Sequence, residues 1–74
     1  MTLGEKIQKL RKEKGLSQEA LAEKVTVTRQ TISKWELGQS TPDLDFIAQL
    51  SDIFNVSSDY LIKDELTEPD ELLV

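Results

Sequence analysis

The stretch VTVTRQTISKWELG, residues 25–38, decides the fold. Val27 precedes Thr28, and Ile32 follows Thr28 by four residues. A Thr at an N-cap accepts a hydrogen bond from the first turn, and the apolar residues on either side of the cap pack together, so this pattern predicts that a helix begins at residue 28. At about 100° per residue, Ile32 and Trp35 share one face. We expect this face, Trp35 included, to lie in a core rather than to stack on a base.

The opposite face of the same predicted helix is polar. Its members are Gln30, Ser33, Lys34 and Leu37, with Arg29 at the edge. A polar helix face is usually only solvated. Arg and Gln are, however, side chains that can make two hydrogen bonds to one base edge in duplex DNA, Arg to guanine and Gln to adenine. From this helix alone, both interpretations stay open.

Four further helix starts carry cap signals of the same kind. Each has Ser, Thr or Asp directly before a segment with apolar residues at helical spacing, and the first also has the Glu that completes a capping box. The expected N-caps are Thr2 (with Glu5), Ser17, Asp43 and Ser57. The predicted helices cover residues 2–14, 17–24, 28–37, 43–54 and 57–63. No segment alternates like a strand, so the predicted fold class is all-α, a compact five-helix bundle.

Apolar stripes on these helices predict the core. The first helix contributes Leu3, Ile7 and Leu10, and the fourth contributes Leu44, Ile47, Leu50, Ser51 and Phe54. Phe46 lies off that stripe. Single exposed apolar residues are ordinary, but Phe46 with Ile53 and the Tyr60–Ile62 region could also form a dimer contact. The sequence does not decide between these interpretations.

Only VTV separates the second and third predicted helices. Two helices joined by so tight a turn are typical of a helix-turn-helix unit, in which the N-terminal part of the second helix contacts base edges in the major groove. Arg29 and Gln30 stand at that position, and Lys34 follows one turn later. Gln18 begins the preceding helix, where it would face the phosphate backbone.

The charge of the chain is divided along its length. The net charge is -5, but residues 1–34 carry eight Lys and Arg against four Asp and Glu, and residues 35–74 carry one Lys against ten. A basic half of this kind indicates a nucleic-acid face, and Lys9 or Lys12 could add phosphate contacts or be merely solvated. Residues 64–74, DELTEPDELLV, are expected to form an acidic, disordered tail or the start of a linker.

Several functions are disfavoured by composition. The chain has no His and no Cys, so the commonest general base, the strongest nucleophile and thiolate metal ligands are missing. We therefore expect no catalytic residue, metal or cofactor. No apolar run reaches membrane-spanning length, so we expect a cytoplasmic domain without membrane contact. A nucleic-acid face would associate it with the nucleoid.

The run GLSQEALAEKVTVTRQTISKWELGQSTPDLDFIAQLSDIFNVSSDYL, residues 15–61, resembles the DNA-binding domain of the phage repressor and Cro family, the xenobiotic-response-element type. The resemblance implies a lambda-repressor-like fold over residues 1–63, with the third helix in the major groove. It further implies sequence-specific binding of double-stranded DNA by a bacterial or phage transcriptional regulator, more often a repressor, as a homodimer on an inverted repeat. The implied base contacts are Arg29, Gln30, Ser33 and Lys34; the implied backbone contacts are Gln18, Thr28, Gln39 and Ser40; the implied structural ion pair joins Arg11 and Glu36.

Two positions depart from the family pattern. Thr26 stands where the turn usually has Gly, which predicts a strained or altered backbone. Leu37 stands where a polar residue often contacts a phosphate, and it could weaken binding, pack on the loop or touch a thymine methyl group. The rival hypothesis for the whole domain is a partner-binding module with weak or no DNA recognition. A further domain or protein partner at the C-terminus is a separate possibility.

Overall fold

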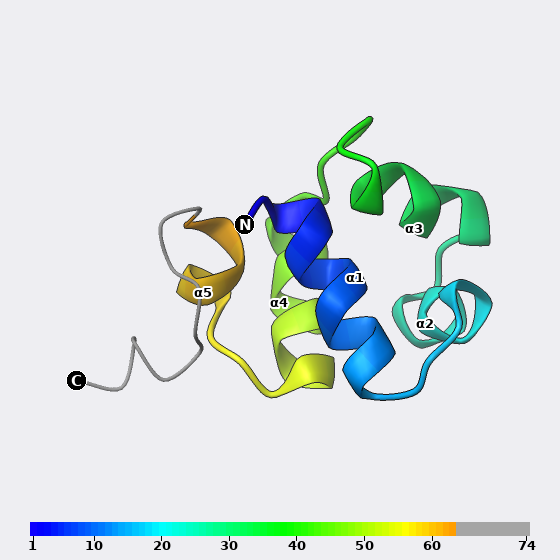
Figure 1. The fold of residues 1–74 in the computed structure, drawn as a ribbon, viewed down its shortest axis with the longest axis horizontal. Coiled ribbons are helices and arrows are strands. Elements are labelled where there is room, and N and C mark those ends of the chain that lie inside the picture. Colours follow the sequence, from blue (N-terminus) through cyan, green and yellow to red (C-terminus); the bar gives the residue numbers. More distant parts are fainter. Residues whose placement is uncertain (64–74) are drawn as a thin grey trace.

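A computed structural model describes residues 1–63 of the 74-residue chain. Its helices are α1 (Leu3–Glu13), α2 (Gln18–Val25), α3 (Arg29–Glu36), α4 (Leu44–Phe54) and α5 (Ser58–Ile62). In Figure 1, α1 and α4 lie in the middle, α2 and α3 at one end and α5 at the other. Residues 1–63 contain no strand, which confirms the all-α prediction. The predicted acidic tail, residues 64–74, lies outside the described residues.

Every helix begins after the N-cap that the sequence predicted. Each cap side chain accepts a hydrogen bond from the backbone N–H three residues later, which fixes the start of the helix. The caps are Thr2, Ser17, Thr28, Asp43 and Ser57. At α1 the capping box is complete, since the Thr2 N–H also donates to Glu5 Oε1 at 2.9 Å. Hydrogen bonds from the Thr2 backbone and side chain lower the pKa of the Glu5 carboxyl because they favour its charged form.

The core lies between the helices, with α1 packed against α3 and α5, and α4 packed against α2 and α5. Side chains with no exposed surface come from all five helices, namely Ile7, Leu21, Ile32, Leu50, Tyr60 and Leu61. Trp35 is 4% exposed, so it belongs to the core as predicted. The off-stripe Phe46 is half-buried, and its ring lies 5.3 Å from that of Trp35.

One expectation about an apolar residue was wrong. Leu44 is 77% exposed rather than part of the α4 stripe. Leu44 is the first residue of α4, and helical side chains lean toward the N-terminus, so its side chain has no preceding turn of its own helix to cover. Among the residues for which the sequence left a dimer contact open, Tyr60 is fully buried and so is itself unavailable for one. Of the region proposed for that contact, Ile62 is exposed.

α1 touches α3 through a glycine. A Cβ atom on Gly4 would lie 2.4 Å from the Trp35 carbonyl oxygen and 2.6 Å from that of Glu36. These distances are far below van der Waals contact with backbone atoms that cannot rotate away. Gly4 therefore allows the start of α1 to approach the end of α3 more closely than any other residue could.

α1 touches α5 through a buried lysine that the sequence analysis did not single out. Lys6 has no exposed surface. Its Nζ atom donates to the carbonyl oxygens of Tyr60, at 2.5 Å, and Lys63, and lies 4.7 Å from the centre of the Tyr60 ring. Carbonyls at the end of a helix have no partner within the helix. Lys6 supplies one and so attaches the end of α5 to α1.

Candidate nucleic-acid interface

The turn between α2 and α3 is made without glycine. Thr26 adopts φ 62° and ψ 45°, the left-handed conformation in which Gly is usually found. The turn is closed by the Val27 N–H, which donates to the Ala22 carbonyl oxygen at 3.0 Å. A non-glycine residue in this region costs about 1–2 kcal/mol. The turn therefore has the left-handed backbone and includes the strain that the sequence predicted at Thr26.

α3 has one buried and one exposed face. Ile32 and Trp35 are at most 4% exposed. On the other side, a shallow hollow of about 400 Å³ is lined by Arg29, Gln30, Ser33, Lys34 and Gln39. The structure thus brings together the four residues expected to contact bases and one expected to contact the DNA backbone. Two of the five are cations, and all five are hydrogen-bond donors.

A polar chain of side chains runs from the interior to this face. Arg11 donates from Nε to Glu36 Oε2 at 2.6 Å and from Nη2 to Glu36 Oε1 at 3.1 Å, which makes a two-point ion pair. Gln18 Nε2 donates to the same Glu36 Oε1 at 3.0 Å. Gln18 Oε1 in turn accepts from Arg29 Nη1 at 3.3 Å. The family resemblance implied the pair of Arg11 with Glu36, which the structure contains, but the sequence analysis gave neither contact of Gln18.

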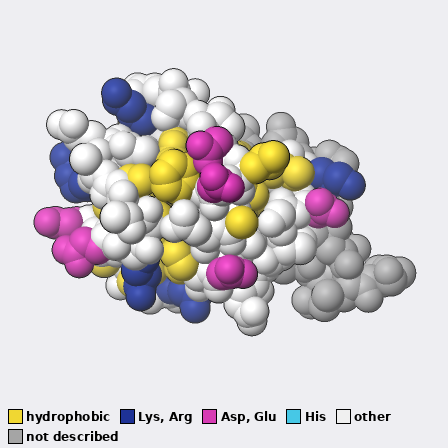
Figure 2. Space-filling view, turned by 180° about the vertical axis from the view of Figure 1, so that it is seen from behind, with side chains coloured by type: hydrophobic (Ala, Val, Ile, Leu, Met, Phe, Trp, Pro, Cys, Tyr) yellow, Lys and Arg dark blue, Asp and Glu magenta, His cyan; other side chains and the backbone are white. Residues whose placement is uncertain are grey.

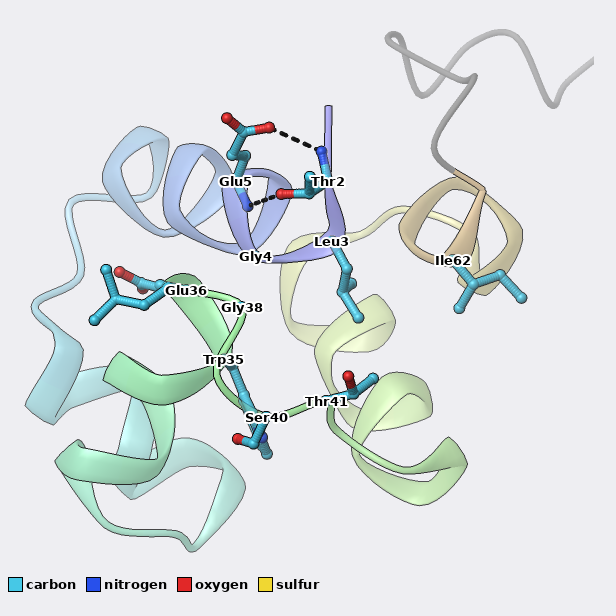
Figure 3. A pocket seen from close by; sticks show the side chains of 11 residues that line it. Thr2, Leu3, Gly4, Glu5, Trp35, Glu36, Gly38, Ser40, Thr41 and Ile62 are labelled. Carbon is cyan, nitrogen blue, oxygen red and sulfur yellow. Dashed lines mark hydrogen bonds between the residues drawn. The ribbon is translucent and has the colours of Figure 1, made fainter.

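The remaining residues expected at the backbone lie at the edges of this face. Thr28 is exposed, but its hydroxyl oxygen already accepts from the Thr31 N–H at 3.2 Å as the N-cap of α3. Ser40 lines a second hollow rather than the one on α3. That second hollow, about 620 Å³, lies between the start of α1, the end of α3 and α5 (Figure 3).

Leu37 belongs to this second hollow, although the sequence placed it with the polar residues of α3. It is 68% exposed and lines the hollow with Leu3, Ser40, Thr41 and Ile62. Figure 3 shows Leu3 and Ile62 projecting from α1 and α5 toward it. Leu37 is the C-cap of α3 and has no place in the hollow lined by Gln30 and Lys34.

The segment between α3 and α4 carries no positive charge. Residues 37–45 contain no Lys or Arg, and both of their acidic residues, Asp43 and Asp45, are exposed. Figure 2 shows the α4 side of the molecule, where acidic and apolar side chains lie next to each other, while most of the Lys and Arg visible there lie toward α2 and α3. Cations available to phosphates are therefore concentrated on α1–α3.

These features define a helix-turn-helix domain with a polar face on its second helix, α3. A family model for helix-turn-helix proteins matches residues 7–61. The chain therefore belongs to this helix-turn-helix family. None of the helices within residues 1–63 is both long and apolar enough to cross a membrane.

Relatives and solved structures agree with this classification. The SPbeta prophage-derived transcriptional regulator YonR of Bacillus subtilis is 43% identical over 60 residues, which are 81% of this chain and 56% of YonR. The transcriptional activator BcrR of Enterococcus faecalis is 43% identical over 65 residues, 88% of this chain and 32% of BcrR. The crystal structure of the P22 c2 repressor in complex with a synthetic operator superimposes with a TM-score of 0.82 and 34% identity, and covers 88% of this chain and 98% of that one.

The matched region is only part of the related proteins. The chain spans about half the length of the first two curated relatives that it matches, 56% and 57%. What the comparison establishes is therefore the domain and its fold class, a five-helix bundle of the phage-repressor type.

Proposed function

We propose that residues 1–63 bind double-stranded DNA sequence-specifically, with α3 in the major groove. The observation that carries this proposal is the hollow on α3, where Arg29, Gln30, Ser33 and Lys34 share an exposed surface directly opposite a buried apolar face. Arg and Lys suit guanine, and Gln suits adenine. The P22 c2 repressor, whose domain has the same fold, was solved with an operator.

We assign contacts with the DNA backbone to residues around that hollow. Gln18 and Thr28 stand at or before the first residues of α2 and α3, where helix N-termini attract phosphate. Gln39 and Ser40 follow α3. We assign all four to phosphates, and the Arg11–Glu36 pair to the support of α2 and α3 from inside.

The family supports the biological role that we propose. The whole protein acts as a bacterial or phage transcriptional regulator in the cytoplasm, associated with the nucleoid. It represses by occupying an operator, as a homodimer on an inverted repeat with half-sites about one helical turn apart.

Selection from a random DNA pool tests this proposal. The wild-type chain should enrich one shared motif with two-fold symmetry, and binding should weaken as salt rises, since each phosphate contact contributes about -0.9 to the slope of log K against log salt. A pool without any common sequence would refute DNA recognition and favour the partner-binding module. A motif without symmetry would refute only the dimer.

A single substitution tests the residue assignment. Gln30→Ala should relax preference at one base pair and lose about 1–3 kcal/mol of binding free energy. Gln49→Ala is the matched control, because Gln49 is exposed on α4, away from the hollow. An unchanged motif in Gln30→Ala would remove Gln30 from the base contacts and leave the function standing.

A further inference from the structure

The second hollow, between the start of α1, the end of α3 and α5, has no part in the DNA contacts that depend on the polar hollow. We propose that it is the docking site for a protein partner that supplies an amphipathic helix with Lys or Arg beside its apolar residues. The second hollow measures about 620 Å³ and shares no lining residue with the hollow on α3. The proposal therefore goes beyond DNA binding and does not depend on it.

The walls of the second hollow are apolar and exposed. Leu37 and Ile62 are 68% and 49% exposed, and they are two of the four large apolar side chains exposed within residues 1–63. They come from the end of α3 and from α5, and the half-buried Leu3 of α1 lies between them (Figure 3). The hydroxyl groups of Ser40 and Thr41 lie beside them. Apolar surface gathered in one concavity with polar groups at its rim is typical of a contact with another molecule.

Two glycines keep the second hollow open. Gly4 and Gly38 both line it and have no side chain to fill it. A Cβ atom on Gly38 would meet no atom within 4 Å, so the space above this residue is empty. The volume of the hollow is within the range of sites that enclose a bound group. It can therefore receive apolar side chains from a partner.

The charge of the lining selects a basic partner. Glu5 and Glu36 are its charged members, and no Lys or Arg of residues 1–63 lines the hollow. Glu36 is paired with Arg11. Glu5 is exposed, and hydrogen bonds from Thr2 lower the pKa of its carboxyl, so a negative charge remains at the rim. A partner with Lys or Arg next to its apolar residues complements this charge.

The secondary structure of the chain favours a helix as the occupant. Residues 1–63 contain no strand, so they offer no sheet edge to which an extended peptide could add. Walls formed by three helices are instead suited to a helix that lays its apolar face into a groove. Such a helix inserts side chains at i, i+3 and i+4 spacing.

Like charges disfavour the two occupants that this chain could supply itself. In a second copy, Leu44 is the most exposed apolar side chain, at 77%. Asp43 and Asp45 stand on either side of it, so its insertion would bring two carboxylates toward Glu5. Residues 64–74 hold five acidic residues and no basic one. Because like charges across an interface weaken binding, a separate basic partner fits better than either.

Peptide selection tests the proposal. The probe is a library of short helix-forming peptides of random sequence, displayed on phage and selected on the 74-residue chain, with counter-selection on Leu37→Ser. We expect enrichment of peptides with apolar residues three or four positions apart and more Lys and Arg than Asp and Glu. The synthesised consensus peptide is then titrated and followed by amide chemical shifts. Gly4, Gly38 and Thr41 should shift, whereas Gln30 and Ser33 should not.

Matched variants measure the two parts of the recognition. Leu37→Ser should weaken binding of the consensus peptide about tenfold, because an apolar wall is lost. Leu44→Ser removes an exposed Leu outside the hollow and should change binding less than about twofold. Glu5→Gln removes the charge but keeps the capping box, in which Gln serves as well as Glu. It should weaken binding about twofold. Ile62→Ser tests the opposite wall and provides a second variant if Leu37→Ser does not fold.

Several results would overturn the proposal. The library could yield no peptide that prefers the wild-type chain to Leu37→Ser, or the enriched peptides could be mainly acidic. Without peptide, a shift of the lining amides on dilution would assign the hollow to a second copy. A shift of the same amides in Leu72→Ser/Leu73→Ser would assign it to residues 64–74. None of these results changes the outcome of the DNA pool selection, so the two proposals fail independently.

Discussion

Lys6 and Arg11 are two buried basic side chains of α1. The free-energy cost of burying each charge is offset by different partners. Arg11 lies at the α3 end of the bundle and faces a carboxylate, Glu36. Lys6 lies against α5 and donates to the carbonyl oxygens of Tyr60 and Lys63. Burying a charge is tolerated when its donors are satisfied. The comparison shows that α1 connects both ends of the bundle, and that the connection to α3 continues through two further side chains, Gln18 and Arg29.

Arg11→Met should have the largest effect. It leaves the Glu36 carboxylate buried without its counter-ion, and breaking a buried pair in this way costs about 3–5 kcal/mol. Urea denaturation followed by circular dichroism measures the loss. In Arg11→Met/Glu36→Leu the unpaired charge is also gone, so most of the stability should return. A double variant as unstable as the single one would show that the Arg11 contacts with Leu16 or the helix itself, and not the charge pair, hold this end.

Gly4→Ala tests whether the backbone contact at Gly4 or the Arg11–Glu36 ion pair sets the distance between α1 and α3. A Cβ atom there would meet the Trp35 carbonyl oxygen at 2.4 Å, so the helices must separate. We expect a loss of about 2 kcal/mol in the free energy of unfolding. Helix propensity alone would give the opposite sign, a gain of about 1 kcal/mol. A stabilised variant in thermal denaturation would therefore show that this contact yields easily.

Lys6→Met should have the smallest of the three effects. Met keeps most of the apolar stem, but the Tyr60 carbonyl oxygen loses a buried donor, which costs about 1–2 kcal/mol. Native-state hydrogen exchange should show faster exchange in α5 and little change in α3. Arg11→Met is the comparison, because it should affect α2 and α3 first. Equal changes in both variants at both ends would remove the distinction drawn between the two side chains.

Local signals predicted the helices well, because cap chemistry is contained within four residues. Thr28 and Asp43 are identifiable as caps from their neighbours alone, and both are N-caps in the structure. Asn55, a residue type that adopts the left-handed conformation readily, is the C-cap of α4 with φ 57°. The sequence analysis wrongly assigned Leu44 to the core stripe of α4. Leu44 has the helical spacing of that stripe, but it directly follows the N-cap, so there is no preceding turn of α4 for its side chain to pack on.

Contacts between distant parts of the chain were not predictable in the same way. Lys6 lies one residue before the apolar Ile7, and nothing near it in sequence indicates that its partners are 54 and 57 residues away. The polar set on α3 was predictable from helical angle, and the structure places it around one hollow. The hydrogen bond from Arg29 to Gln18 was not predictable, because it depends on the angle at which α2 and α3 meet.

Residues 37–45 contain no Lys or Arg and two Asp. The lack of cations there affects how the protein would find an operator among other DNA. Nonspecific DNA competes with an operator in proportion to the phosphate contacts that a protein makes with any sequence. Residues 1–63 carry nine Lys and Arg and nine Asp and Glu, and the segment beside the recognition helix adds no cation. Under the proposed function, such a domain should be attracted to DNA in general less than one with cations beside α3. It would therefore spend less time on wrong sites and depend more on its base contacts to remain on the right one.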